Sequence, residues 1–304
     1  MTDEAEFTLY AGDWSAVVSF WGASLRGVTW RGEPVVTGYR GTANKSGGQG
    51  DVLLPFAGRV AGGRYTWDGH VHQLPLTDKD GPNAIHGFVR AVPWTVHART
   101  RQSVEFTLDF AGAPGYDFPL LLQLGYHITA GGLHVACSMT NAGSHDAPVA
   151  MGFHPYFTVG SAVVDPDRLL LPFQRVLEFE RLIPTGRVLP VEDVGLDFTR
   201  TRAIGDTLFN HCFASPVRDT DGMARVRFGN AVREVAIWMD ETFDYLVVYT
   251  GDALAPALRR ASIAIEPMSS ATDALNHPEW GLRRLAPGAT MSGRWGVELG
   301  RPGL

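Results

Sequence analysis

The sequence is poor in features that mark several large classes of protein. Its two cysteines, Cys137 and Cys212, are too few for a disulfide framework and lack the paired spacing of a zinc or redox site. No apolar run approaches membrane-spanning length, and the acidic start MTDEAEFTLY lacks the basic and apolar regions of a signal peptide. We therefore expect a cytoplasmic protein without a membrane partner.

Positive charge is also scarce. The chain has 26 Lys and Arg against 32 Asp and Glu, a formal net charge of −6, and contains no basic run. The electrostatic footprint of a nucleic-acid-binding protein is thus missing, and we expect no nucleic-acid partner. His70 and His72 share a predicted strand face, but without an HExxH motif or a cysteine ligand set we expect no metal site.

Amphipathic helical patterns are missing as well. Short alternating or β-branched and aromatic stretches recur between Gly, Pro, Asn and Asp, for example SVEFTLDF, LLLQLGYHI, LHVACSMTN and REVAIWM. No repeat of fixed period indicates propeller blades. The pattern predicts an all-β fold, a large antiparallel β-sandwich in which residues 1–304 form one domain.

Four prolines interrupt the least regular segment, from about Thr158 to Asp206. They are Pro166, Pro172, Pro184 and Pro190. We expect this segment to form long loops over one sheet.

The stretch PVAMGFHPYF places a histidine within an apolar run. In a strand, His154 would share its face with Ala150 and Gly152, while larger apolar residues point the other way. A face of small residues would leave a void in a packed core, so we expect something else to occupy the space above it. Pro155 favours an extended backbone at His154, which would hold the imidazole on a stiff support.

The stretch SIAIEPM repeats this design. Ile263 and Ile265 would face one way, and Ala264 and Glu266 the other. A carboxylate behind small neighbours at a strand end is placed to project into a cleft. Partial burial would raise its pKa toward neutrality, as a general base requires.

Two further stretches carry candidate binding residues. In LLPFAGRV, Arg59 follows Gly58 in an apolar setting, where a ligand hydroxyl or carboxylate would serve as its partner. In GPNAIHGFVR, His86 lies between a turn containing Asn83 and Gly87, which permits close approach of a ligand.

Each of these residues taken alone has a structural explanation. His154 or His86 is about as often a hydrogen-bonded structural histidine as a catalytic one, and an isolated Glu such as Glu266 is more often a surface or capping residue. Arg59 alone is equally explained by a structural ion pair. Trp238 would stack on a sugar face, but such a residue taken alone is more often part of the core. Their combination is what favours a site.

Six motifs in order resemble the aldose 1-epimerases, also called galactose mutarotases. They are PFAGR, PNAIHGF, GFHPYF, PTG, EPMSSATDALN and LAPGATMSGRWGV. The similarity covers nearly the whole chain, from WGASL to WGVEL. It implies a galactose mutarotase-like supersandwich with a sugar cleft on one sheet, and neither a metal nor an organic cofactor.

The resemblance also implies roles for individual residues. His154 matches the family's general acid and Glu266 its general base, while Arg59 and His86 match residues that hold the sugar. Asn83 and Trp238 are expected as additional sugar contacts.

One position departs from the family pattern. In LFNHCF, Asn210 stands where family members usually carry an Asp that contacts the sugar. Asn retains hydrogen bonding but loses the charge, which bears on the preferred sugar more than on the reaction. Asp206, four residues earlier, is the alternative.

The predicted function is interconversion of the α and β anomers of a free hexose by acid–base ring opening and closure, with an aldose as the small-molecule partner. One alternative is a hexose-6-phosphate 1-epimerase, with Arg64, Arg90 and Arg187 as candidate phosphate ligands. The other is a non-catalytic sugar-binding sandwich, which would need no acid–base pair. The sequence leaves open a homodimer formed through surface Trp and Tyr residues.

Overall fold

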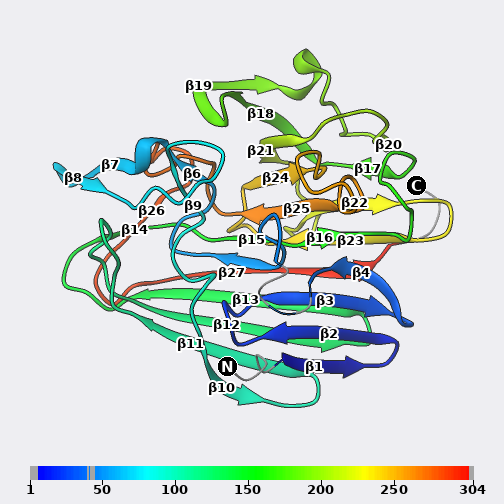
Figure 1. The fold of residues 1–304 in the computed structure, drawn as a ribbon, viewed down its shortest axis with the longest axis horizontal. Helices are drawn as coiled ribbons and strands as arrows, with labels where there is room; N and C mark the ends of the chain where they lie inside the picture. The colour runs from blue at the N-terminus through cyan, green and yellow to red at the C-terminus, as the bar shows by residue number, and fades with distance from the viewer. Residues whose placement is uncertain (1–5, 40, 42–44, 301–304) are drawn as a thin grey trace.

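Two large antiparallel sheets pack face to face in the computed structural model, which describes residues 6–39, 41 and 45–300 (Figure 1). Among these residues, 12 strands form the first sheet, in the order β1 (Glu6–Ala11), β2 (Trp14–Ser19), β3 (Leu25–Trp30), β4 (Glu33–Thr37), β16 (Tyr156–Phe157), β25 (Ile263–Met268), β24 (Tyr245–Tyr249), β21 (Asn210–Pro216), β18 (Phe173–Glu180) and β19 (Ile183–Pro190), with β15 (Gly152–His154) beside β25 and β5 (Asp51–Leu53) beside β15. The predicted all-β sandwich is confirmed.

The second sheet has nine strands within the described part of the chain. Their order is β10 (Thr95–Arg99), β11 (Ser103–Phe110), β12 (Leu120–Thr129), β13 (Gly132–Asn141), β27 (Thr290–Leu299), β23 (Glu234–Met239), β22 (Ala224–Gly229), β17 (Arg168–Leu170) and β20 (Arg202–Ala203). The smaller elements are the pairs β14 (Ala147–Val149) with β26 (Arg283–Leu285), β6 (Arg59–Val60) with β9 (Ala84–Ile85) and β7 (Arg64–Trp67) with β8 (His70–Gln73), and the 3₁₀ turns η2 (Ala61–Gly63) and η3 (Val191–Val194). No helix among the described residues is long and apolar enough to cross a membrane.

Strand β12 shows how the sequence pattern produces the sandwich. Leu122, Leu124 and Tyr126 alternate with Gln123 and Gly125, and the first set is buried. Side chains of a strand point alternately to its two faces, so one face joins the core between the sheets and the other meets solvent. Strands β1 and β2 of the first sheet pack against this inner face.

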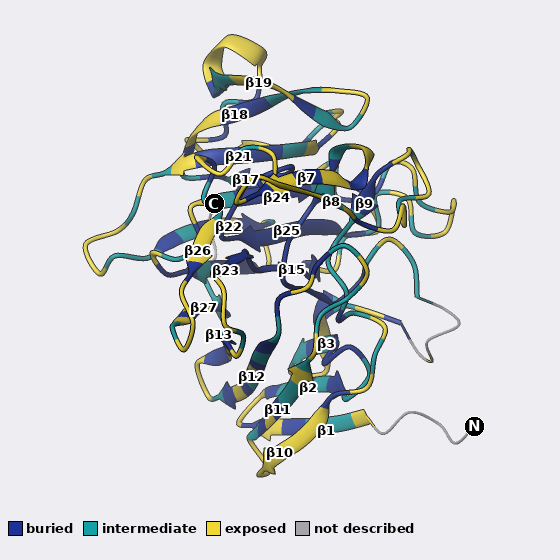
Figure 2. Cartoon of the chain, turned by 90° about the vertical axis from the view of Figure 1, so that its left-hand side faces the viewer, coloured by how far each residue is buried: buried dark blue, intermediate teal, exposed yellow. Residues whose placement is uncertain are grey.

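Strand β25 is buried along its whole length and lies at the centre of the molecule (Figure 2). Ile263 and Ile265 belong to the core between the sheets. Because side chains alternate, Glu266 points to the opposite face of the 12-stranded sheet. That face is covered in part by chain outside the sheets, which creates the setting for a site.

The segment from Thr158 to Asp206 differs from the expectation of long loops. It forms β17, β18, β19, η3 and β20, and β19 is the last strand of the 12-stranded sheet. The prolines fit this arrangement because Pro166 and Pro172 lie between elements and Pro190 ends β19. Pro184 lies within β19, whose edge position tolerates a residue without a backbone N–H.

Candidate active site

A cavity of about 760 Å³ lies over the face of the 12-stranded sheet that carries Glu266. Five of the seven predicted site residues line it, and Asn83 and Trp238 do not. The five are Arg59, His86, His154, Asn210 and Glu266.

The centre of the cavity is a buried acid–base pair. Nε2 of His154 lies 3.4 Å from Oε1 of Glu266, although the two residues come from distant parts of the chain. Neighbouring strands bring them together, because β15 pairs with β25. Among the described residues, His154 Nδ1 and Glu266 Oε2 have no hydrogen-bond partner. Buried polar atoms are nearly always paired, so two unpaired atoms in one contact pair are an exception that a purely structural role does not explain.

Burial shifts the pKa of both groups toward their neutral forms. It lowers the pKa of His154 to about 3, an effect to which the charges of Arg90 and Lys45 add. Burial also raises the pKa of Glu266 well above its ordinary value, although the charge of Arg59 opposes the shift. Burial therefore favours the form of the pair that holds a single proton, on Glu266. Transfer of that proton to His154 gives a carboxylate base beside an imidazolium acid, so one pair can supply both functions.

The His154 ring is held from two sides. Tyr156 stacks on it, with ring centroids 5.2 Å apart and planes at 16°. Gly48 lies against it so closely that an added Cβ would come within 2.8 Å of His154 Cδ2. The Tyr156 hydroxyl donates to the carbonyl of Gly47 at 2.7 Å, which fixes the Ser46–Gly48 loop over the ring. The imidazole therefore has little freedom to turn away from Glu266.

The small neighbours of His154 have a different role from the one expected. An added Cβ at Gly152 would lie 2.4 Å from Met268 Sδ and 2.7 Å from Ala57 Cβ. The space above Gly152 is thus filled by the protein, and Met268 in turn lines the cavity. The expectation of something above the small face was right, but at Gly152 it is a side chain.

His86 faces the cavity from a backbone conformation that is unusual for histidine. Its φ is 63°, and its ring lies 5.6 Å from that of His154. The N–H of Gly58 donates to Nδ1 at 3.3 Å, so Nδ1 is the acceptor and Nε2 carries the proton. Burial lowers the pKa of His86 well below its usual value, so this histidine is neutral and offers an N–H donor. Strained backbones of this kind gather at ligand sites.

Arg59 forms ion pairs within the protein, so it does not need a ligand as its partner. Its Nε donates to Asp78 Oδ2 at 2.8 Å, and Nη2 lies 3.6 Å from Asp80. All three residues line the cavity. The Arg59 guanidinium lowers the pKa of Asp78 against the effect of burial, so Asp78 remains charged.

Asn83 supports this ion pair from behind instead of lining the cavity. It is buried, and its Nδ2 donates to Asp78 Oδ2 at 3.2 Å. Its Oδ1 accepts a hydrogen bond from the N–H of Gly62. Asn83 therefore contacts Asp78, which lines the cavity, and not the cavity itself. The expected sugar contact is corrected in this way because a turn signal does not tell which way the side chain points.

Trp238 lies on the other sheet. It belongs to β23, packs 5.4 Å from His134 and covers the backbone of Gly296, whose added Cβ would lie 2.5 Å from the indole. The expected sugar stacking in the cavity is therefore wrong for this residue. An aromatic residue over a strand glycine fills the gap left by the missing side chain.

Asn210, and not Asp206, reaches the cavity. It is an exposed residue at the first position of β21. Tyr249, which pairs with Asn210 from the neighbouring strand β24, also lines the cavity. A hydroxyl and an amide therefore stand together on the wall beyond Glu266.

Sequence reasoning missed Asp51 and Lys45 on the cavity wall, and it considered Arg90 there only as a candidate phosphate ligand. Asp51 is buried on β5, and Lys45 and Arg90 form ion pairs with it. Burial raises the pKa of Asp51 to about 6, even though both cations oppose the shift. The one available indication was an acidic residue directly before the apolar run VLLPF.

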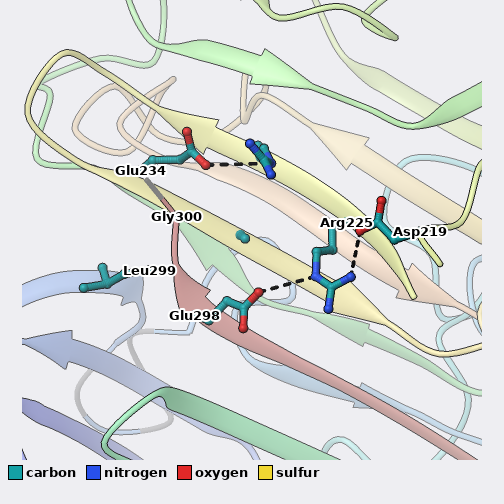
Figure 3. A pocket seen from close by; sticks show the side chains of 8 residues that line it. Asp219, Arg225, Glu234, Glu298, Leu299 and Gly300 are labelled. Atoms are coloured by element: carbon teal, nitrogen blue, oxygen red, sulfur yellow. Dashed lines mark hydrogen bonds and ion pairs between the residues drawn. The ribbon is translucent and has the colours of Figure 1, made fainter. Parts of the chain in front are cut away.

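A second hollow, on the outer face of the nine-stranded sheet, is of a different kind (Figure 3). Arg225 is paired there with Asp219, Asp221 and Glu298, at 2.7, 2.6 and 3.4 Å. Charges that neutralise one another at the surface indicate a salt-bridge network, and none of the predicted site residues lies in this hollow.

Metal ligands are not gathered anywhere in the described part of the chain, since no group of three or more His, Cys, Asp or Glu is placed to hold an ion. His72, one of the two histidines considered for such a site, stacks on Tyr65 with ring centroids 4.7 Å apart.

Comparison with known proteins agrees with this geometry. The sequence model of the aldose 1-epimerase family matches residues 6–297. The uncharacterized protein YihR of Escherichia coli K12 is 30% identical over 88% of this chain and 85% of its own length, and galactose mutarotase of Mus musculus is 26% identical over 93% and 90%.

Solved structures show the same fold. A GalM/aldose epimerase homologue from C. elegans superimposes with a TM-score of 0.88 at 18% identity, covering 99% of this chain and all of the other. A putative aldose 1-epimerase from E. coli K12 gives 0.81 at 24% identity, with 97% and 99% covered. The match to the family model and the similarity to YihR show that the chain belongs to the aldose 1-epimerase family.

Proposed function

We propose that the protein interconverts the α and β anomers of an aldose, with Glu266 and His154 as its base and acid. The observation that carries the proposal is the buried pair itself, 3.4 Å apart on the cavity wall, with one unpaired polar atom on each residue. A sugar C1 placed over the pair would have its hydroxyl beside one group and its ring oxygen beside the other.

The pair then completes the reaction without outside reagents. Glu266 removes the proton of the C1 hydroxyl while protonated His154 gives its proton to the ring oxygen, and the C1–O5 bond breaks to leave the open-chain aldehyde. This leaves Glu266 protonated and His154 neutral, which is the arrangement that burial favours. After rotation about C1–C2, the O5 hydroxyl attacks the other face of the carbonyl. His154 takes the O5 proton and Glu266 returns its proton to O1.

The remaining lining residues orient the sugar. His86 offers an N–H donor beside His154, and the Arg59–Asp78 pair adds charged groups to the cavity wall. Asn210 and Tyr249 add neutral donors and acceptors. Positioning groups of this kind hold the ring oxygen toward the acid, which converts loose binding into a reactive geometry.

The test is the relaxation of freshly dissolved α-D-glucose and α-D-galactose toward anomeric equilibrium, followed by polarimetry. We expect acceleration by the native protein and a loss of about 10²–10⁴-fold with Glu266→Gln, the usual contribution of a general base. Glu105→Gln, on the exposed side of β11, is the matched control and should keep full activity.

Native activity that persists in Glu266→Gln would refute Glu266 as the base. Sugar binding by the native protein without any acceleration would favour the non-catalytic alternative.

A further inference from the structure

The cavity has a cationic end that the acid–base chemistry does not use. Lys45 and Arg90 line it there, both in ion pairs with Asp51. The Arg90 Nη1–Asp51 Oδ2 distance is 3.6 Å, and Lys45 also donates to the carbonyl of Arg90 at 3.3 Å.

Asp51 also lines the cavity, but its two cations are the exposed members of this group. The Asp51 side chain is 0% exposed, whereas the side chains of Lys45 and Arg90 are 21% and 28% exposed. One carboxylate shared by two cations leaves a net positive charge. The Asp51 contact is also the one hydrogen bond or ion pair that the Arg90 side chain makes with described residues, so most of its five N–H donors remain available.

The strand order places this end on a particular side of the acid–base pair. Strand β15 lies between β5 and β25, and His154 is directly opposite Asp51 in the β5–β15 register. Residues directly opposite in an antiparallel pair point to the same face. Asp51 with its cations and Glu266 therefore lie on opposite sides of His154.

The covalent structure of a pyranose follows the same order. O1 is bonded to C1, C1 to the ring oxygen, the ring oxygen to C5, and C5 carries C6. With O1 at Glu266 and the ring oxygen at His154, the C6 substituent lies beyond His154, at Lys45 and Arg90.

Resting on the function proposed above, we propose that the preferred substrate is an aldohexose with an anionic group at C6, bound by Lys45 and Arg90. The shared chemistry is a carboxylate, sulfonate or phosphate on C6. Arginine and lysine are the usual ligands of such groups, and arginine can bind them through two N–H bonds at once.

An anion at this end would also assist the chemistry. Burial first, and then the charges of Arg90 and Lys45, disfavour the imidazolium form of His154 that must protonate the ring oxygen. An anionic substituent between these cations and His154 offsets their charge. Binding of the anionic substrate would thus favour protonation of His154, the proposed acid.

The experiment compares kcat/KM for glucose, glucuronate, glucose 6-phosphate and glucose with a sulfonate at C6. NMR magnetisation exchange between anomers gives each rate, after the rate in buffer is subtracted. We expect at least one anionic sugar to exceed glucose by about tenfold to a hundredfold, the range for a hydrogen-bonded charge. The three anionic sugars identify which group fits.

Variants of the two cations test the residue assignment. Arg90→Met and Lys45→Met should each lower the ratio of anionic to neutral kcat/KM by about tenfold or more. Because the ratio is measured on one preparation, partial unfolding cancels from it. Arg64→Met removes an exposed arginine on β7 outside the cavity and is the matched control, with an unchanged ratio.

The outcomes separate this inference from the proposed function. Acceleration of glucose with no preference for any anionic sugar overturns the inference and leaves the epimerase proposal standing. Variants that lower both rates equally show that the cations are only structural, which also overturns it. No acceleration of any sugar overturns both proposals.

Discussion

Replacing Glu266 by glutamine should stabilise the fold while it removes activity, and the gain should grow with pH. The side chain is buried, Oε2 has no hydrogen-bond partner among the described residues, and burial raises its pKa. In the unfolded chain the same carboxyl titrates near 4.3. Above that pH the folded state must retain a proton that the unfolded state releases, so the contribution of Glu266 to stability falls as pH rises toward its folded pKa.

The size of the effect follows from proton linkage. A difference of one bound proton changes the free energy of unfolding by about 1.4 kcal/mol per pH unit. Glutamine has nearly the same shape and no such proton, so the stability of Glu266→Gln relative to the native protein should rise by up to this amount per unit between pH 5 and the folded pKa. For a chain of 304 residues, with an unfolding entropy of about 2.1 cal/mol/K per residue, each kcal/mol changes the melting temperature by about 1.6 °C.

The assay is thermal unfolding at pH 5, 6, 7 and 8 for the native protein, Glu266→Gln and Glu105→Gln. The exposed Glu105 variant should follow the native protein at every pH, because its side chain lies on the solvent face of β11. A difference between Glu266→Gln and native protein that stays flat across this range would refute the reasoning, because it would mean that Glu266 is ionised in the folded state.

Three further predictions concern the rest of the site. Burial lowers the pKa of His154 to about 3, so the acid limb of kcat/KM should lie well below 6.5, and a pH–rate profile that falls with a midpoint near 6.5 would contradict this. Gly48→Ala should reduce kcat by about tenfold or more, because its Cβ would press on the His154 ring. Gly32→Ala is its control, with a similarly positive φ of 81° but open space around the Cβ, and both stability and kcat are to be measured for the two variants. Trp238→Phe should leave kcat/KM unchanged, and a raised KM would show that this tryptophan reaches the sugar after all.

The sequence was sufficient to place both residues of the proposed acid–base pair on the cavity side of their strands. Period-2 alternation assigns faces, so Ile263 and Ile265 in the core imply that Glu266 is on the other side. By the same rule, His154 points to the face of β15 away from Phe153, whose side chain is in the core. Local pattern carries this information because the direction of a side chain in a strand depends only on its position along that strand.

Pattern failed where the outcome depended on which strands are neighbours. Trp238 is a residue type that often stacks on sugars, but its strand β23 belongs to the nine-stranded sheet and not to the sheet that carries the cavity. Pro184 suggested a loop, yet an edge strand accepts it. Asn83 was placed in the right motif with the wrong orientation, since a turn fixes the backbone and leaves the side chain to its surroundings.

By itself, then, the sequence determined the all-β class, the faces of the strands that carry His154 and Glu266, and the family motifs. Only the tertiary structure decided that β5, β15 and β25 lie side by side, which sets Asp51 and its two cations on one flank of His154 and Glu266 on the other. The physical reason is that strand direction is local, whereas strand pairing joins segments distant in the chain and is fixed by the packing of the whole sheet. The burial that shifts both pKa values belongs to the same long-range packing, because desolvation depends on everything that surrounds the pair.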